Sequence, residues 1–301
     1  PLGTEMVQGF ASVLSAQSMF PVLSPDEMAG HYTESDVARA VRQGFLTGED
    51  GAWSLISARV ADIKEYQSAF EQINGPGHSV TFTDISDVIA EFIAFEWRAD
   101  DSPFDQYLRT GEPLPKAAHL GMSLFYGKAQ CSTCHAGQFQ TDHDFHAIAL
   151  PQVGPGKSAR FETHARDEGR LRVTGNPADA YKFRTPSLRN IAQTAPYGHN
   201  GAYATLEAMI RHHLDPVASL KAYNVAQLVL PDLPNSQDFR ATHDPDEQAA
   251  IAAANELSPS NLSETEIMQI VAFLNALSDT ASLAGKLGVP QTVPSGLSVD
   301  Q

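Results

Sequence analysis

The segment Cys131-Ser132-Thr133-Cys134-His135 constrains this chain more than any other part of it. Its two cysteines are the only ones in 301 residues, so they cannot build a disulfide framework. A Cys-x-x-Cys pair alone would also suit zinc or a redox-active dithiol, but a histidine directly after it is typical of covalent haem c attachment. A zinc site would need two further Cys or His ligands at similar spacing. The motif therefore predicts two thioether bonds to haem and an axial iron ligand from the histidine.

The composition fits a globular protein that is large enough for two domains. Of the 301 residues, 42% are hydrophobic and 19% are charged, and domains usually have about 100–200 residues. The longest apolar runs, such as those within 87–97, are far shorter than the ~20 residues of a membrane-spanning helix. We therefore expect no membrane span. The chain begins at Pro1 and shows no signal peptide, so we expect a processed or trimmed product.

The net charge of −16 bears on the kind of partner this protein can have. It argues against nucleic acid, because the phosphates would be repelled. It would suit electrostatic steering toward a small basic redox protein. The alternative is that the charge only keeps the protein in solution.

Helical spacing of apolar residues recurs along the chain and predicts a mostly α fold. The predicted helices lie at 8–18, 34–46, 84–97, 116–128 and 205–214. A further helix begins with a capping box at Ser263 and Glu266 and carries an apolar stripe from Ile267 to Leu277. There is no internal repeat and no alternating run long enough for a sheet.

One break in this helical pattern, and the loss of pattern near the end of the sequence, predict the domain organisation. Charged residues and a proline at 100–103 interrupt the helices, and we predict an N-terminal domain at 1–105 and a C-terminal cytochrome c domain at 106–281. The remainder, 282–301, contains glycine and proline with little pattern and is predicted to be an arm or a disordered tail. Residues 137–181 form a long irregular stretch, which is expected to wrap a cofactor.

The second axial ligand of the iron decides the chemistry of such a haem. An open position binds peroxide or oxygen, whereas a second strong ligand leaves an electron-transfer haem. The best candidates are His212 and His213 on the helix predicted at 205–214. Helical spacing places His213 on the apolar stripe of this helix and His212 about 100° away. The stripe consists of Leu206, Met209, Ile210 and His213. We therefore predict His213 as the second ligand.

Four further stretches resemble the bacterial di-haem cytochrome c peroxidase and MauG family. They are FRTPSLRN at 183–190, TAPYGHNG at 194–201, Gly-x-x-Leu-Phe at 121–125, and Leu-Ser at 262–263. The resemblance implies cytochrome c-like haem domains in a two-domain di-haem peroxidase architecture. One haem, in the N-terminal domain, reacts with peroxide, and the other, in the C-terminal domain, transfers electrons. The motif at 131–135 matches the C-terminal haem.

The resemblance also implies an axial ligand for this haem. In the family a Met or Tyr follows seven residues after a leucine, and here that leucine is Leu206, which again leads to His213. A histidine in place of methionine should lower the reduction potential of the haem, since thioether ligation raises it.

Residues of a peroxide pocket and of a calcium site follow from the same resemblance. Gln17, Pro21 and Glu27 reproduce the spacing of the pocket in MauG-like proteins. Glu27 would be the acid–base group for O–O cleavage, and Gln17 would position peroxide or water. The family's calcium ion, bound between the haems, would take backbone carbonyls of Thr194 and Pro196, because oxygen donors suit calcium.

The chain departs from the family pattern at its beginning. The first haem motif should precede Gln17 by a few tens of residues, and the tryptophan expected between the haems would fall at Val7. Three interpretations are open: an N-terminal segment has been lost, the first haem belongs to another polypeptide, or the protein has a single haem.

Two functions of different kinds follow from these expectations. The first is a peroxidase-type oxidoreductase that uses H₂O₂ as oxidant and passes electrons between the haem on His135 and His213 and a second haem. Its partner would be a small redox protein, or a protein whose side chains it oxidises. The second is a non-enzymatic bis-histidine electron carrier or a subunit of a redox complex. The resemblance further implies the periplasm and a possible homodimer.

Overall fold

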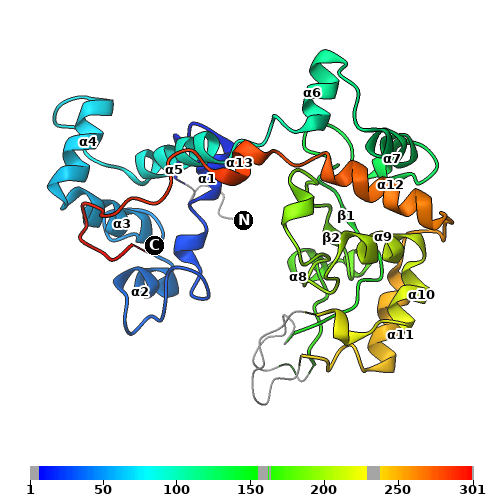
Figure 1. Ribbon diagram of the computed structural model, residues 1–301. Coiled ribbons are helices and arrows are strands. Elements are labelled where there is room, and N and C mark those ends of the chain that lie inside the picture. Colours follow the sequence, from blue (N-terminus) through cyan, green and yellow to red (C-terminus); the bar gives the residue numbers. More distant parts are fainter. Residues whose placement is uncertain (1–6, 155–161, 163, 229–237, 300–301) are drawn as a thin grey trace. The chain divides into compact units, whose positions relative to one another are not determined.

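The structure is a computed structural model, which describes residues 7–154, 162, 164–228 and 238–299. The chain divides into two compact units, the first formed by 1–98 with 284–301 and the second by 99–283. Both are built mainly of helices (Figure 1), so the predicted mostly α fold is confirmed. None of the helices in the described ranges is both long and apolar enough to cross a membrane.

The first unit contains five α-helices and one short 3₁₀ helix within its described residues. They are α1 (Val13–Gln17), η2 (Pro21–Leu23), α2 (Asp36–Gln43), α3 (Ala52–Ala61), α4 (Lys64–Asn74) and α5 (Phe82–Glu96). α5 begins with a capping box, in which the Thr81 hydroxyl accepts from the Asp84 amide and the Asp84 carboxylate accepts from the Thr81 amide. A core of the first unit forms around Met19, Trp53 and Phe82.

The second unit carries the haem motif, and most of its helices are short. They are α6 (Pro103–Thr110), α7 (Lys116–Tyr126), α8 (Leu171–Thr174), α9 (Leu206–Leu214), α10 (Pro216–Lys221), α11 (Pro245–Ala254), α12 (Glu264–Asn275) and α13 (Thr280–Ala284), whose last residue belongs to the first unit. The 3₁₀ helices are η3 (Cys131–Thr133), η4 (Pro177–Asp179), η5 (Ile191–Gln193) and η6 (Val225–Gln227). β1 (Phe145–His146) pairs antiparallel with β2 (Phe183–Arg184), with Phe145 opposite Arg184.

The core of the second unit lies where α7 packs against α12 (Figure 1). Phe125 of α7 and Phe273 of α12 are buried with ring centroids 5.2 Å apart. Gly121 allows the two backbones to approach, because a Cβ atom there would lie 1.9 Å from the carbonyl oxygen of Gln269. The haem motif follows α7 directly, so this contact fixes where the motif begins.

The two compact units divide the chain at places other than those predicted. α6 belongs to the second unit, because Phe104 enters its core and the Phe104 amide donates to the Ala276 carbonyl, 3.0 Å away. The segment after 284 belongs to the first unit and is not separate, since the Glu96 carboxylate accepts hydrogen bonds from the amides of Leu287 (2.7 Å) and Gly288 (3.3 Å).

Candidate haem site

The two cysteines of the motif lie on a tight turn between α7 and the loop that follows. Cys131 opens η3, and the His135 amide donates to the Cys131 carbonyl over 2.9 Å, which closes the turn. Both thiols are free and half-buried. Burial raises the pKa of Cys131 to about 11. Burial also raises the pKa of Cys134, with a further contribution from the Asp142 carboxylate. The pair is therefore protonated at neutral pH and available for covalent attachment.

The imidazole of His135 is held by the loop after the motif. Its Nδ1 lies 3.2 Å from the carbonyl oxygen of Gln140. Burial and the neighbouring His213 lower the pKa of His135 to about 4, although carbonyl groups of Gln140 and Pro186 favour the charged ring. His135 is thus neutral at physiological pH, as a metal-binding imidazole must be.

His213 lies opposite His135 within the second unit. The two ring centroids are 6.5 Å apart, and the ring planes meet at 63°. The Nδ1 of His213 lies 2.9 Å from the Met209 carbonyl oxygen one turn earlier in α9. Burial lowers the pKa of His213, so this ring is also neutral. The structure therefore brings together the two residues that the sequence suggested as axial ligands.

The spacing of these rings fits an iron atom held between them. A metal–imidazole bond is about 2 Å long, so two nitrogens bound in line would separate the ring centres by roughly 6 Å. In both rings Nδ1 faces a backbone carbonyl, which is the usual arrangement that orients a ligating imidazole through its other nitrogen. With Cys131 and Cys134 beside His135, the donor set suits a covalent, bis-histidine haem c.

His212 has a different environment from its neighbour on α9. It is fully buried, with Nδ1 2.8 Å from the Tyr203 hydroxyl and Nε2 2.7 Å from the Ile148 carbonyl. Burial, with His213 nearby, lowers the pKa of His212 to about 4. Both nitrogens are occupied by protein groups, so the geometry favours His213 over His212 as the ligand.

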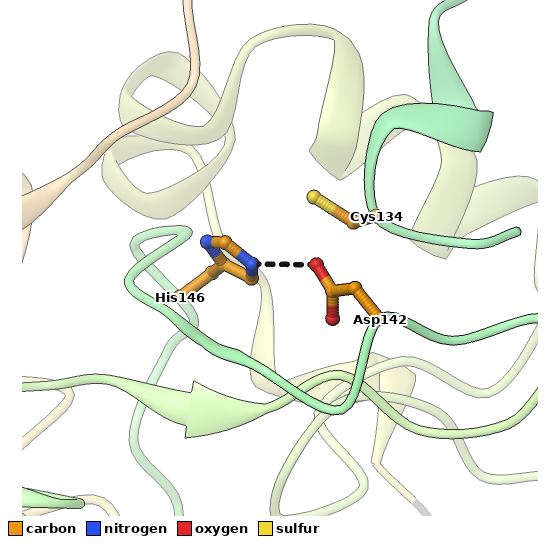
Figure 2. A group of neighbouring side chains, drawn as sticks. All are labelled: Cys134, Asp142 and His146. Atoms are coloured by element: carbon orange, nitrogen blue, oxygen red, sulfur yellow. Dashed lines mark hydrogen bonds and ion pairs between the residues drawn. The ribbon is translucent and has the colours of Figure 1, made fainter.

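A second group of potential metal ligands adjoins the motif. Cys134, Asp142 and His146 place one ligand atom each within 4.8 Å of one another. Figure 2 shows the Asp142 carboxylate directed at the His146 ring, 2.9 Å away, with the Cys134 sulfur close by. The other ring nitrogen of His146 lies 3.3 Å from the Glu256 carboxylate, which Lys182 also contacts at 2.5 Å.

This group could bind a divalent metal only while Cys134 is a free thiol. A thioether bond at Cys134 removes the thiolate that zinc would need, and Asp142 and His146 then pair with each other. Neither Asp142 nor His146 was predicted from the sequence as a site residue. Their spacing of four residues within an irregular segment rich in His and Asp was the available signal.

The three residues matched to the peroxide pocket lie in the first unit. Gln17 ends α1 and Pro21 begins η2, while Glu27 lies in the turn that follows. The Met28 amide donates to the Pro21 carbonyl over 3.2 Å, which folds the Glu27 turn back onto Pro21. The residues Gln17 and Glu27 are exposed and Pro21 is half-buried. Their match to a pocket remains a prediction.

The carbonyls matched to calcium lie in the turn after η5. Thr194 and Pro196 are both exposed, and the Ala195–Pro196 peptide bond is cis. The Thr194 hydroxyl donates to the Ile191 carbonyl over 3.2 Å. Thr194 and Pro196 thus lie on the surface of the second unit, and calcium binding by their carbonyls remains a prediction.

Comparison with known proteins points to one family. The sequence model of the di-haem cytochrome c peroxidase family matches residues 3–112. Cytochrome-c peroxidase IdrP1 of Denitromonas iodatirespirans is 29% identical over 279 residues, 85% of this chain and 65% of that protein. Cytochrome c peroxidase Ccp of Escherichia coli K12 is 31% identical over 205 residues, 67% of this chain and 38% of that protein.

Two further comparisons agree. Methylamine utilization protein MauG of Methylorubrum extorquens is 28% identical over 210 residues, 68% of this chain and 50% of that protein. The crystal structure of the diheme peroxidase BthA of Burkholderia thailandensis E264 is similar in fold, with a TM-score of 0.53 and 20% identity over 96% of this chain and 68% of that one. The chain spans less than two thirds of the length of these three curated relatives. The chain is thus similar in sequence to the di-haem cytochrome c peroxidase and MauG family.

Proposed function

We propose that this chain is the electron-transfer half of a di-haem peroxidase. Cys131 and Cys134 would hold a haem c covalently, and His135 and His213 would bind its iron. The observation that supports this assignment is the opposed pair of neutral imidazoles, one from the attachment motif and one from α9, whose ring centroids are 6.5 Å apart. When bound, the haem supplies a one-electron iron couple with both axial positions taken.

The residues around this haem decide whether it can bind peroxide and how low its reduction potential is. Two imidazole ligands leave no position for peroxide, so peroxide reacts elsewhere in the complete protein. His213 in the place of a thioether ligand keeps the reduction potential low. The Gln140 and Met209 carbonyls hold the two rings by Nδ1.

We propose that peroxide reacts at a pocket to which residues of the first unit contribute. Gln17 positions peroxide by a hydrogen bond, Glu27 accepts and returns a proton during O–O cleavage, and Pro21 shapes the pocket between them. The hydrogen bond from the Met28 amide to the Pro21 carbonyl supports this assignment, because it holds the Glu27 turn close to Pro21. This reaction uses H₂O₂ and needs a second haem.

We also propose a calcium ion, a cellular location and redox partners for this protein. A calcium ion binds the Thr194 and Pro196 carbonyls. The protein acts in the periplasm, where c-type haem is attached, and exchanges electrons with a small redox protein or with side chains of a protein substrate. The net charge of −16 supports a basic partner. The protein forms a homodimer, or it binds a partner chain that carries the second haem.

The deciding experiment measures the haem content and the ferric spectrum of one purified sample, with and without H₂O₂. Two haems in the complete protein, one of them high-spin and changed by peroxide, are expected for the peroxidase. A complete protein with two haems that leaves H₂O₂ unconsumed would refute the enzymatic proposal.

The second candidate function is a bis-histidine electron carrier or a subunit of a redox complex. It is favoured by the same opposed histidines, since a haem with both axial positions filled transfers electrons without binding a substrate. One low-spin haem per chain that does not respond to peroxide is the expected result for this function. A stable partner on size-exclusion chromatography would identify a subunit.

A further inference from the structure

Gln140 is a buried polar residue in the loop after the haem motif, and its backbone conformation is unusual. Its exposed fraction is 5%, and its φ of 52° lies in the left-handed region. Residues with a side chain adopt this region rarely, and they keep it only where the surroundings hold them in place. The contacts of Gln140 must therefore hold this residue in its unusual conformation.

Four hydrogen bonds define the position of Gln140. Its backbone amide donates to the Gly137 carbonyl over 3.1 Å. Its backbone carbonyl faces the Nδ1 of His135 at 3.2 Å. Its side-chain Nε2 donates to the Gly137 carbonyl over 3.1 Å. Its Oε1 accepts from the Tyr126 hydroxyl, also over 3.1 Å. The side chain thus ties the carbonyl that holds His135 to the last residue of α7.

A carbonyl at Nδ1 affects a ligating imidazole in two ways. It fixes the tautomer and the orientation of the ring, and it makes the ring a stronger electron donor to the metal. A stronger hydrogen bond therefore lowers the reduction potential of a bound iron, and a weaker one raises it. The Tyr126 hydroxyl and the Gly137 carbonyl hold the Gln140 side chain, and this restrains the residue whose carbonyl faces His135.

We propose that Tyr126 and Gln140 are positioning residues that set the orientation and basicity of His135, and thereby the reduction potential of the haem bound there. Pro186 offers a second carbonyl to the same ring. The test therefore changes only the Tyr126 and Gln140 side of the contact. The inference rests on the proposed haem attachment at His135, but it does not depend on a reaction with peroxide.

The test is a spectroelectrochemical titration of the complete, haem-loaded protein. Tyr126→Phe removes only the hydroxyl, and Gln140→Met removes both side-chain hydrogen bonds at similar length. Both variants should raise the midpoint potential of the low-spin haem, Gln140→Met more strongly, and should shift its electron paramagnetic resonance g-values. Tyr107→Phe is the matched control, because Tyr107 lines the same surface groove as Tyr126, and its potential should equal that of the wild type.

Each outcome separates this inference from the proposed function. Unchanged potentials and g-values in both variants would overturn it, and so would an equal shift in Tyr107→Phe. A change in the unfolding midpoint alone would show a merely structural role and would also overturn it. A wild-type protein without covalent haem would refute this inference and the haem assignment together, whereas a loaded protein inert to peroxide would refute only the enzymatic part.

Discussion

The Nε2 atom of His212 lies 2.7 Å from the carbonyl oxygen of Ile148. Because a carbonyl can only accept, this nitrogen is assigned the proton of the neutral ring. Nδ1 is then the acceptor for the Tyr203 hydroxyl, 2.8 Å away. The neighbouring His213 directs Nδ1 to its own helix and faces His135. Two adjacent histidines on α9 therefore serve different purposes, one anchoring the helix and one available to a metal.

Replacing His213 should change the coordination of the haem. His213→Ala should convert the ferric spectrum from low-spin to high-spin, because one strong ligand is lost. His213→Met should keep six ligands and raise the midpoint potential, since thioether ligation raises it. Absorption spectra and a redox titration of the purified variants measure both effects.

His212→Gln is the matched control for the His213 variants. It should keep the low-spin spectrum and lower the free energy of unfolding by about 1–3 kcal/mol, because a buried partner such as the Tyr203 hydroxyl loses its hydrogen bond. A low-spin spectrum that survives in His213→Ala but disappears in His212→Gln would reverse the assignment of the ligand.

Several helices with a clear apolar period were predictable from the sequence, and other helices of similar length were missed. The predictions at 84–97, 116–128 and 205–214 match α5, α7 and α9 to within two residues at each end. The helix predicted at 8–18 is wrong in extent, since only Val13–Gln17 is helical, and Ser12 caps its start. α3, α4, α6, α10 and α11 were not predicted, and several of them are too short to show a full apolar period.

Some residues of the candidate site could likewise be predicted from the sequence, and others could not. The attachment motif and His213 follow from local spacing along the chain, so sequence alone could suggest them. Gln140 and His146 could not be found in this way, because their contacts depend on how an irregular loop folds back. β1 and β2 illustrate this: they pair a segment within the predicted irregular stretch, 145–146, with one that lies after it, 183–184.

The pair of Asp142 and His146 should make stability depend on acid pH. Desolvation alone would raise the pKa of Asp142, but hydrogen bonds from His146 and the Asp144 amide outweigh it and lower the pKa to about 2. An Asp in the unfolded chain has a pKa of roughly 4. The stabilisation is therefore fully present above about pH 4 and is lost as the pH falls toward 2.

Urea unfolding between pH 2 and 6 measures this contribution. Asp142→Asn should flatten the decline of the free energy of unfolding below pH 4 relative to wild type. His146→Gln should flatten it as well, because it removes the charged partner of the carboxylate. An identical acid-side slope in wild type and both variants would contradict the predicted role of the pair.

Gly121 should not tolerate a side chain. A Cβ atom there would meet the Gln269 carbonyl oxygen at 1.9 Å, and that oxygen belongs to the backbone of α12. α7 and α12 would have to separate, so Gly121→Ala should lower the free energy of unfolding by about 1–3 kcal/mol or more. Thermal unfolding followed by circular dichroism measures the loss. Lys116→Ala, at an exposed position of the same helix, should change stability by no more than about 0.5 kcal/mol.

The proposed peroxide residues can be tested without disturbing the fold. Gln17 and Glu27 are exposed, so Gln17→Leu and Glu27→Gln should leave the unfolding midpoint close to that of wild type. Loss of a positioned acid–base group usually costs about 10²–10⁴ in rate. In the protein that carries both haems, Glu27→Gln should therefore slow H₂O₂ consumption by that factor while the low-spin spectrum of the His135 haem stays unchanged. Glu34→Gln, another exposed carboxylate a few residues further on, should react at the wild-type rate. Equal rates in all of these variants would show that the pocket lies elsewhere.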